Sequence, residues 1–173
     1  MRSSAASDVY KRQIKDNVDF VNGDVRNMDD WKKAIQNQDA VIHLAAETGT
    51  GQSMYEVERY VNVNIRGTAI LLDLLANNKH QIQKVVVASS RAIYGEGKYF
   101  SDTLGVVYPK ERSEYQMSNA IFDHLCAHSN KTLKSLPTDE NSKIHPSSIY
   151  GITKHNQEQM ILVGCKSLDI PAV

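Results

Sequence analysis

Two short apolar runs, separated by one long amphipathic segment, limit the folds open to this chain more than anything else in its sequence. Residues 39–46 and 84–90 are mostly apolar, and the second run is rich in β-branched residues. Such a run is typical of a strand buried on both faces of a parallel sheet. Between them, apolar residues recur every three or four positions over 55–78, which predicts a helix. A strand, a helix and a second strand in this order predict a parallel βαβ unit.

The flanking segments continue this alternation. Residues 18–22 alternate apolar and polar, which predicts a short strand, and a helix over 31–37 follows. A second helical pattern covers 148–168, and 169–173 predict the opening of another strand. The candidate buried residues of that helix are Ile152, Met160, Ile161 and Val163. The chain is therefore predicted to be an α/β protein with a doubly wound parallel sheet.

Residues 96–146 break the alternation. They contain several Gly and Pro residues, scattered charges and no sustained period, which predicts a long irregular insertion. Long loops of this kind are often functional. His124, Cys126 and His128 alternate within it, but a zinc site needs four ligands in two closely spaced pairs and no second pair is evident. We therefore expect no metal site.

Composition removes several classes of function. Twenty Lys and Arg residues balance twenty Asp and Glu residues, so no net charge attracts nucleic acid or an anionic membrane. No apolar run approaches the ~20 residues of a membrane span. Two cysteines suggest no disulfide framework and favour a cytoplasmic location. Residues 1–13 lack the apolar core of a signal peptide and any regular period, so we expect a non-native leader there and one partial domain over 14–173.

Tyr150 and Lys154 are the strongest candidates for chemistry. Their spacing places a phenol and an ammonium on one helix face, where the cation favours the phenolate and makes an acid/base at neutral pH. Tyr94 and Lys98 have the same spacing, but two intervening glycines argue against a helix there. Only the later pair follows residues whose hydroxyls can cap a first turn, Ser147 and Ser148. The alternative is a plain surface pair.

Ser89 and Ser90 end the apolar run at 84–90. Ligands of open α/β sheets bind at the carboxyl ends of the strands, so a serine hydroxyl there can hold a substrate oxygen beside Tyr150. The structural alternative is that Ser90 only caps the strand end. Six ordered segments now carry a resemblance: 23–26 (GDVR), 41–46 (VIHLAA), 64–68 (NIRGT), 87–90 (VASS), 93–95 (IYG) and 150–154 (YGITK).

Together these segments resemble the extended short-chain dehydrogenase/reductase family, and within it the NAD-dependent nucleotide-sugar epimerases and dehydratases. Residues 46–55 and the insertion are most similar to the dTDP-L-rhamnose 4-epimerase branch. The resemblance implies a Rossmann-type domain, NAD as cofactor, a nucleotide sugar as substrate and a homodimer. The helices at 55–78 and 148–168 would contribute to that dimer, although their apolar faces would equally serve the core of one chain. It covers the chain from about residue 18 to its end.

The resemblance also implies roles for individual residues. The implied catalytic residues are Ser90, Tyr150 and Lys154. Tyr150 would remove the C4 hydroxyl proton of the sugar, leaving a 4-keto sugar that is reduced on its other face. The implied cofactor-binding residues are Asp24, Val25, Leu44, Ala45, Ala46, Asn64, Ala88, Ser89, Tyr150 and Lys154. The implied substrate-binding residues are Glu47, Thr48 and Ser90, with Ser53 as a further candidate.

Several alternatives stay open at this point. Asp24 can be a turn residue and Asn64 a partner of neighbouring backbone. Relatives that act as 4,6-dehydratases carry Asp-Glu directly after the catalytic hydroxyl residue. This chain has Arg91 and Ala92 at those positions, so epimerisation at C4 fits better than dehydration. Another NAD-dependent dehydratase or reductase of nucleotide sugars is the alternative among the enzymes. A non-catalytic remnant that binds a nucleotide or a partner is the alternative outside the enzymes.

The family's glycine-rich turn does not precede Asp24. In the family's topology the strand at 18–22 is the third, so the first two strands, and the C-terminal lobe that holds the substrate nucleotide, are expected to be missing. Unpaired strand edges in a sheet interior are costly. We therefore expect an internal fragment that folds poorly and is inactive alone, belonging to an active parent enzyme.

Overall fold

The sheet of the main body is parallel, as predicted. A computed structural model describes residues 18–173, so the leader expected at 1–13 lies outside the described residues. Strand β1 (Ala40–His43) pairs with β2 (Lys84–Val87) in parallel register, from Ala40 opposite Lys84 to His43 opposite Val87. On the other side of β2, the backbone N–H groups of Val85 and Val87 donate to the carbonyls of Pro171 and Val173. The strand opening predicted at 169–173 is thus confirmed.

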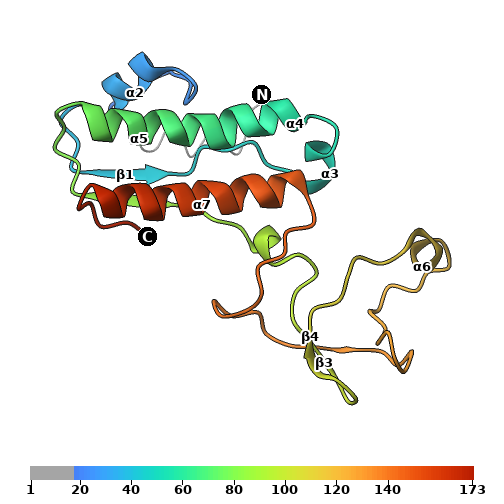
Figure 1. The fold of residues 1–173 in the computed structure, drawn as a ribbon. Coiled ribbons are helices and arrows are strands. Elements are labelled where there is room, and N and C mark those ends of the chain that lie inside the picture. Colours follow the sequence, from blue (N-terminus) through green and yellow to red (C-terminus); the bar gives the residue numbers. More distant parts are fainter. Residues whose placement is uncertain (1–17) are drawn as a thin grey trace.

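Helices cover this sheet (Figure 1). Helix α2 (Met28–Ile35) begins at Asn27, whose side chain accepts a hydrogen bond from the N–H of Asp29. The helix predicted over 55–78 is three consecutive segments: α4 (Val57–Tyr60), the π-helical η2 (Val61–Arg66) and α5 (Gly67–Asn77). A short α3 (Thr50–Ser53) was not predicted. Helix α7 (Ile149–Ser167) begins at Ser148, whose hydroxyl accepts from the N–H of Gly151 at 3.0 Å, as its sequence indicates.

The core lies between β1, β2 and helices α2, α5 and α7. Helices α5 and α7 run side by side in Figure 1, with the strands behind them. The core residues are Trp31, Ile35, Val41, Leu71, Leu74, Leu75, Ile82, Val85, Val87, Ile161, Cys165 and Ile170. This arrangement is an α/β Rossmann-type fold, and none of these core residues comes from the insertion.

Two predictions of packing were wrong. Residues 18–22 are not a strand, and Phe20 is 83% exposed, because within residues 18–173 no strand pairs with this segment. On α7, Ile152 and Val163 are exposed, whereas Ile161 is fully buried. The buried face of α7 instead carries Gly151, Thr153, Lys154, Gln157, Ile161 and Cys165. The helix buries polar side chains that bind one another, so the apolar period did not mark its inner face.

The insertion is more ordered than predicted. It contains a three-stranded antiparallel sheet in the order β4-β3-β5, built from β3 (Tyr99–Ser101), β4 (Gly105–Val107) and β5 (Lys134–Ser135). Helix α6 (Glu114–Ser118) has a capping box between Ser113 and Gln116. Strands of two or three residues are too short to show an alternating pattern, which is why the sequence read as irregular. The insertion extends away from the main body (Figure 1).

The two ends of the insertion meet. The N–H of His145 donates to the carbonyl of Ile93 at 3.0 Å, directly beside Gly95. Gly95 has φ +55, and a Cβ there would lie 2.4 Å from the carbonyl oxygen of His145. Only a glycine permits both this backbone conformation and this close approach.

Candidate active site

A cleft of about 910 Å³ opens beside the carboxyl end of β2 and contains both Ser90 and Tyr150. Its walls come from the segment after β1, from η3 (Arg91–Tyr94), from the insertion and from the start of α7. The remaining lining residues are Gly49, Thr50, Gly51, Met54, Arg91, Ala92, Gly95, Glu96, Tyr99, Glu111, Arg112, Met117, Ser147 and Ser148. The fold therefore brings two of the three predicted catalytic residues to one cavity, where ligands of open α/β sheets bind.

A hydrogen bond to its backbone and a ring contact hold Tyr150 in place. Its N–H donates to the hydroxyl of Ser53 at 3.0 Å, and that hydroxyl donates to the carbonyl of Thr50 at 2.6 Å. Ser53 is fully buried, so it supports the first turn of α7 from the interior. The ring of Tyr150 packs edge-on against Tyr60, with 6.4 Å between the ring centroids. The segment after β1 thus positions the phenol.

Ser90 caps η3 and still lines the cleft. Its hydroxyl accepts a hydrogen bond from the N–H of Ala92 at 3.2 Å. Helix α7 approaches η3 closely, since a Cβ on Gly151 would lie 2.7 Å from the carbonyl oxygen of Ala92. This contact brings the helix that carries Tyr150 against the segment that carries Ser90.

Lys154 is almost completely buried, with 2% of its surface exposed. Its ammonium donates to Oε1 of Gln157 at 2.5 Å, and burial lowers the pKa of this ammonium. Nε2 of Gln157 lies 3.0 Å from Nε2 of His43 on β1. Sequence reasoning missed both partners, although Gln157 lies one helical turn after Lys154 on the same face.

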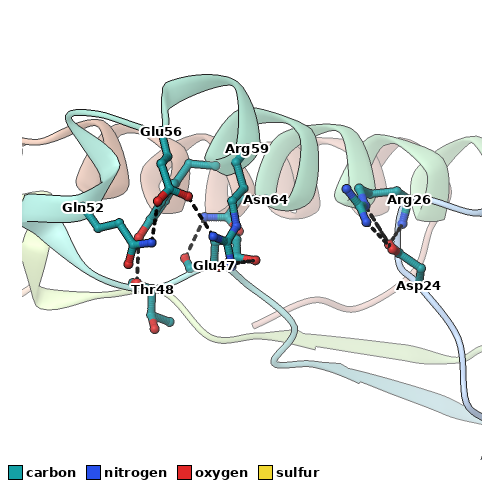
Figure 2. Close-up of polar contacts among 9 residues, drawn as sticks. Asp24, Arg26, Glu47, Thr48, Gln52, Glu56, Arg59 and Asn64 are labelled. Carbon is teal, nitrogen blue, oxygen red and sulfur yellow. Dashed lines mark hydrogen bonds and ion pairs between the residues drawn. The ribbon is translucent and has the colours of Figure 1, made fainter. Parts of the chain in front are cut away.

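Asn64 ties the segment after β1 to α7. Its Oδ1 accepts from the N–H of Glu47 at 2.7 Å, and its Nδ2 donates to the carbonyl of Glu47 and to Oγ1 of Thr153. Figure 2 shows the side chain of Asn64 reaching this backbone. Asn64 is fully buried in the π-helical turn η2. Turns of this type are frequent at functional sites.

Glu47 and Thr48 lie beside the cleft. The guanidinium of Arg59 donates to both carboxylate oxygens of Glu47 at 3.0 Å, and also binds Glu56 at 2.7 Å (Figure 2). The carbonyl of Thr48 accepts from the hydroxyl of Tyr60 at 2.7 Å. Neither residue is among the described side chains that line the cleft, whereas Gly49 and Thr50 of the same segment are.

Comparison with known proteins places this geometry in a family. Residues 2–135 match the NAD dependent epimerase/dehydratase family. The chain belongs to this family. The dTDP-L-rhamnose 4-epimerase of Burkholderia thailandensis is 32% identical over 86% of this chain and 40% of its own length. The bifunctional UDP-glucose and UDP-xylose 4-epimerase 1 of Pisum sativum is 36% identical over 51% of this chain and 25% of its own.

Solved structures share this fold. The UDP-glucuronic acid 4-epimerase of Bacillus cereus, crystallised with UDP-glucuronic acid and NAD, matches 96% of this chain and 42% of its own, with a TM-score of 0.63 and 25% identity. The UDP-glucose 4-epimerase of Thermus thermophilus, crystallised with NAD, has a TM-score of 0.61 at 22% identity, over 90% of this chain and 39% of its own. The epimerase/dehydratase chain described here spans less than half the length of each of these relatives.

Five of the cofactor residues implied for this epimerase/dehydratase chain follow the two strands β1 and β2. Ala88 and Ser89 follow β2, and the hydroxyl of Ser89 donates to Glu158 on α7 at 2.5 Å. Leu44, Ala45 and Ala46 follow β1, and Leu44 is 67% exposed.

Asp24 and Val25 lie apart from the cleft, against a pocket of about 170 Å³ that Trp31 also lines. The carboxylate of Asp24 binds the guanidinium of Arg26 (Figure 2). The Arg26 hydrogen bonds lower the pKa of Asp24 to about 2.

Two of the three insertion residues considered as metal ligands, His124 and Cys126, have other hydrogen-bond partners. Nε2 of His124 lies 2.8 Å from the carboxylate of Glu96, which also accepts from Arg112. The hydroxyl of Ser101 donates to Sγ of Cys126 at 3.3 Å and, with further donors around the sulfur, lowers the pKa of this thiol to about 6. Within residues 18–173, no three His, Cys, Asp or Glu side chains gather as metal ligands. No helix in that range is long and apolar enough to cross a membrane.

Proposed function

We propose that this chain carries the acid/base centre of an NAD-dependent nucleotide-sugar 4-epimerase that acts on a UDP- or dTDP-hexose. The observation that carries the proposal is the single cleft that contains both Ser90 and Tyr150 beside the carboxyl end of β2. The family membership and the names of the relatives support the same reaction class.

In this proposal Ser90 holds the C4 oxygen of the sugar and Tyr150 takes the C4 hydroxyl proton, then returns it after the ketone has turned over. A general acid/base of this kind contributes typically ~10²–10⁴-fold to a rate. Ser53 and Tyr60 keep Tyr150 in place through the hydrogen bond and ring contact described above. Lys154 follows Tyr150 by one helical turn on α7, and in this proposal it serves the same centre.

The residues present fit a bound NAD. An ammonium has three donors, and the Lys154 side chain uses one of them, on Gln157, within the described chain. The free donors suit the ribose hydroxyls of a nicotinamide nucleotide. Ala45, Ala46 and Ser89 follow the carboxyl ends of β1 and β2, where such a cofactor binds in this fold. When bound, NAD supplies a hydride acceptor that can return the hydride to the same carbon.

Epimerisation is favoured over dehydration by the residues after Ser90. Removing a C5 proton and expelling the C6 hydroxyl requires an acid/base pair close to the sugar. Arg91 and Ala92 occupy the two positions that follow Ser90, and both line the cleft. Of the two cleft carboxylates, Glu96 and Glu111, that of Glu96 is already bound by Arg112 and His124, and neither directly follows Ser90 in the chain.

The homodimer implied by the resemblance is part of the same proposal. Apolar side chains stay exposed on α4, η2 and α7, which are the helices implied as the interface. They are Val57, Val61, Ile152, Leu162 and Val163. Sedimentation at several concentrations measures the expected self-association.

The test measures turnover of UDP- and dTDP-hexoses with NAD by the full-length protein. Tyr150→Phe is expected to lower turnover by ~10²–10⁴-fold while NAD still binds. Tyr94→Phe is the matched control, because Tyr94 and Lys98 repeat the spacing of Tyr150 and Lys154 on η3 and beyond it rather than on one long helix. Full turnover in Tyr150→Phe, or a product that has lost water, contradicts the proposal.

A further inference from the structure

The partner of the Lys154 ammonium is uncharged. A buried cation normally pairs with a carboxylate. Here the ammonium donates to the amide oxygen of Gln157, and among residues 18–173 burial alone accounts for its lowered pKa. Gln157 itself is fully buried. The positive charge of Lys154 therefore stays uncancelled inside the protein.

The ammonium also fixes the orientation of the Gln157 amide. Because an ammonium is a donor only, the amide oxygen must face it and the amide NH₂ must face away. The NH₂ group then points at β1, where Nε2 of Gln157 lies 3.0 Å from Nε2 of His43 and 3.4 Å from the carbonyl oxygen of Ala45. Both the oxygen and the NH₂ group of the amide therefore have a partner. Rotating the amide by half a turn would place its NH₂ donors against the ammonium donors of Lys154.

The orientation of Gln157 in turn selects one tautomer of His43. A ring nitrogen that accepts from the amide NH₂ carries no proton, so the proton of the neutral ring lies on Nδ1. Oγ1 of Thr68 lies 3.1 Å from the same Nε2 and 2.7 Å from the carbonyl oxygen of Asn64, so its single proton can also be donated to this unprotonated nitrogen. His43 is 2% exposed and packs edge-on against Trp31, and burial, with the Lys154 charge, lowers its pKa to about 4.

We propose that Gln157 is a positioning residue of the active site, whose neutral amide couples Lys154 on α7 to His43 on β1 and holds the ammonium without cancelling its charge. This inference rests on the proposed function, in which Lys154 supports Tyr150 and the cofactor. A carboxylate at 157 would neutralise that charge, and an apolar side chain would leave the ammonium without its partner. The amide meets both requirements.

The test uses the full-length protein without added cofactor, labelled with ¹⁵N-histidine and ¹³C-lysine, and observed by NMR. The wild-type His43 is expected to be the Nδ1–H tautomer at neutral pH. In Gln157→Glu the carboxylate accepts instead of donating, so the proton of His43 moves to Nε2 or the ring becomes charged. The same carboxylate is expected to raise the titration midpoint of Lys154 by about 1–3 pH units.

Gln159→Glu is the matched control. Gln159 is exposed on the same helix. Gln159→Glu therefore introduces the same charge, and it is expected to leave the His43 and Lys154 NMR signals unchanged. If Gln157→Glu does not fold, Gln157→Met serves instead, because it removes the acceptor at similar size and is expected to lower the Lys154 midpoint. A wild-type Nε2–H tautomer, or Gln157 variants with wild-type His43 and Lys154 signals, would overturn the inference. Failure of the proposed function would appear separately, as full turnover in Tyr150→Phe.

Discussion

At the scale of single residues, burial sets the protonation state of His43. Its pKa falls to about 4, against about 6.5 in an unfolded chain. Between these values the unfolded chain binds a proton that the folded chain does not, so stability is fully present above about pH 6.5 and is lost as the pH falls toward 4. We expect the free energy of unfolding to drop by about 3 kcal/mol across this window because of His43.

Urea unfolding at a series of pH values measures this effect. The variant His43→Gln cannot titrate, so its free energy of unfolding should depend less on pH between 6.5 and 4 than that of the wild type. Parallel pH profiles for the two proteins would show that His43 is not held neutral.

Cys126 gives a second prediction at this scale. Hydrogen bonds from Ser101 and from other donors around the sulfur lower the pKa of this thiol to about 6, whereas burial raises the pKa of Cys165. Thiolate absorbance near 240 nm should therefore rise through about pH 6 in the wild type. Ser101→Ala is expected to move this rise to higher pH, and Cys126→Ser to abolish it. A rise that survives in Cys126→Ser would assign the thiolate to Cys165.

Two glycines of α7 allow a comparison at the scale of elements. A Cβ on Gly151 would lie 2.7 Å from the backbone oxygen of Ala92, whereas one on Gly164 would meet the terminal carbons of Leu72 at 2.8 Å. Backbone of η3 cannot yield without moving Ser90, but a leucine side chain can rotate. Gly151→Ala is therefore expected to cost about 1–3 kcal/mol.

Gly164→Ala is the matched substitution on the same helix. The gain in helix propensity, about 1 kcal/mol, is expected to offset the shift of Leu72, so the stability should stay within about 1 kcal/mol of the wild type. Thermal or urea unfolding of both variants gives the comparison. Equal losses of stability would mean that α7 does not press closely against η3.

The sequence predicts an element well when the residues that determine it lie close together in the chain. Helix α7 was predictable because Ser148 and the spacing of Tyr150 and Lys154 lie within a few residues of one another. The contact between Gln157 and His43 joins positions 114 residues apart, so no local pattern contains it. The expected strand at 18–22 failed for the opposite reason, since its alternation is local but its pairing is not.

For the whole molecule, the fold class was predictable because the βαβ alternation repeats over most of the chain, whereas the small sheet of the insertion was not. The core of the main body contains no insertion residue, so the two parts should respond separately to substitution. Leu71→Ala, at a fully buried site of α5, is expected to cost about 2–5 kcal/mol. Leu133→Ala removes a buried side chain of the insertion and is its counterpart.

Amide hydrogen exchange followed by mass spectrometry distinguishes the two effects. Leu71→Ala should speed exchange in β1, β2, α5 and α7, and Leu133→Ala should speed it mainly within residues 96–146. Uniform acceleration across the chain in both variants would show that the main body and the insertion unfold as one cooperative unit.

The meeting of the insertion ends at Ile93 and His145 bears on how this chain can be altered in evolution or in the laboratory. Because the two ends already lie together, the main body keeps the same boundary whatever the number of residues between them. The entropy of closing a loop grows only slowly with its length, so a shorter or longer segment between these ends changes stability little. The insertion also supplies cleft residues such as Glu96 and Arg112. Exchange of this one segment is thus a route by which a cleft with an unchanged Ser90 and Tyr150 can acquire a different ligand preference.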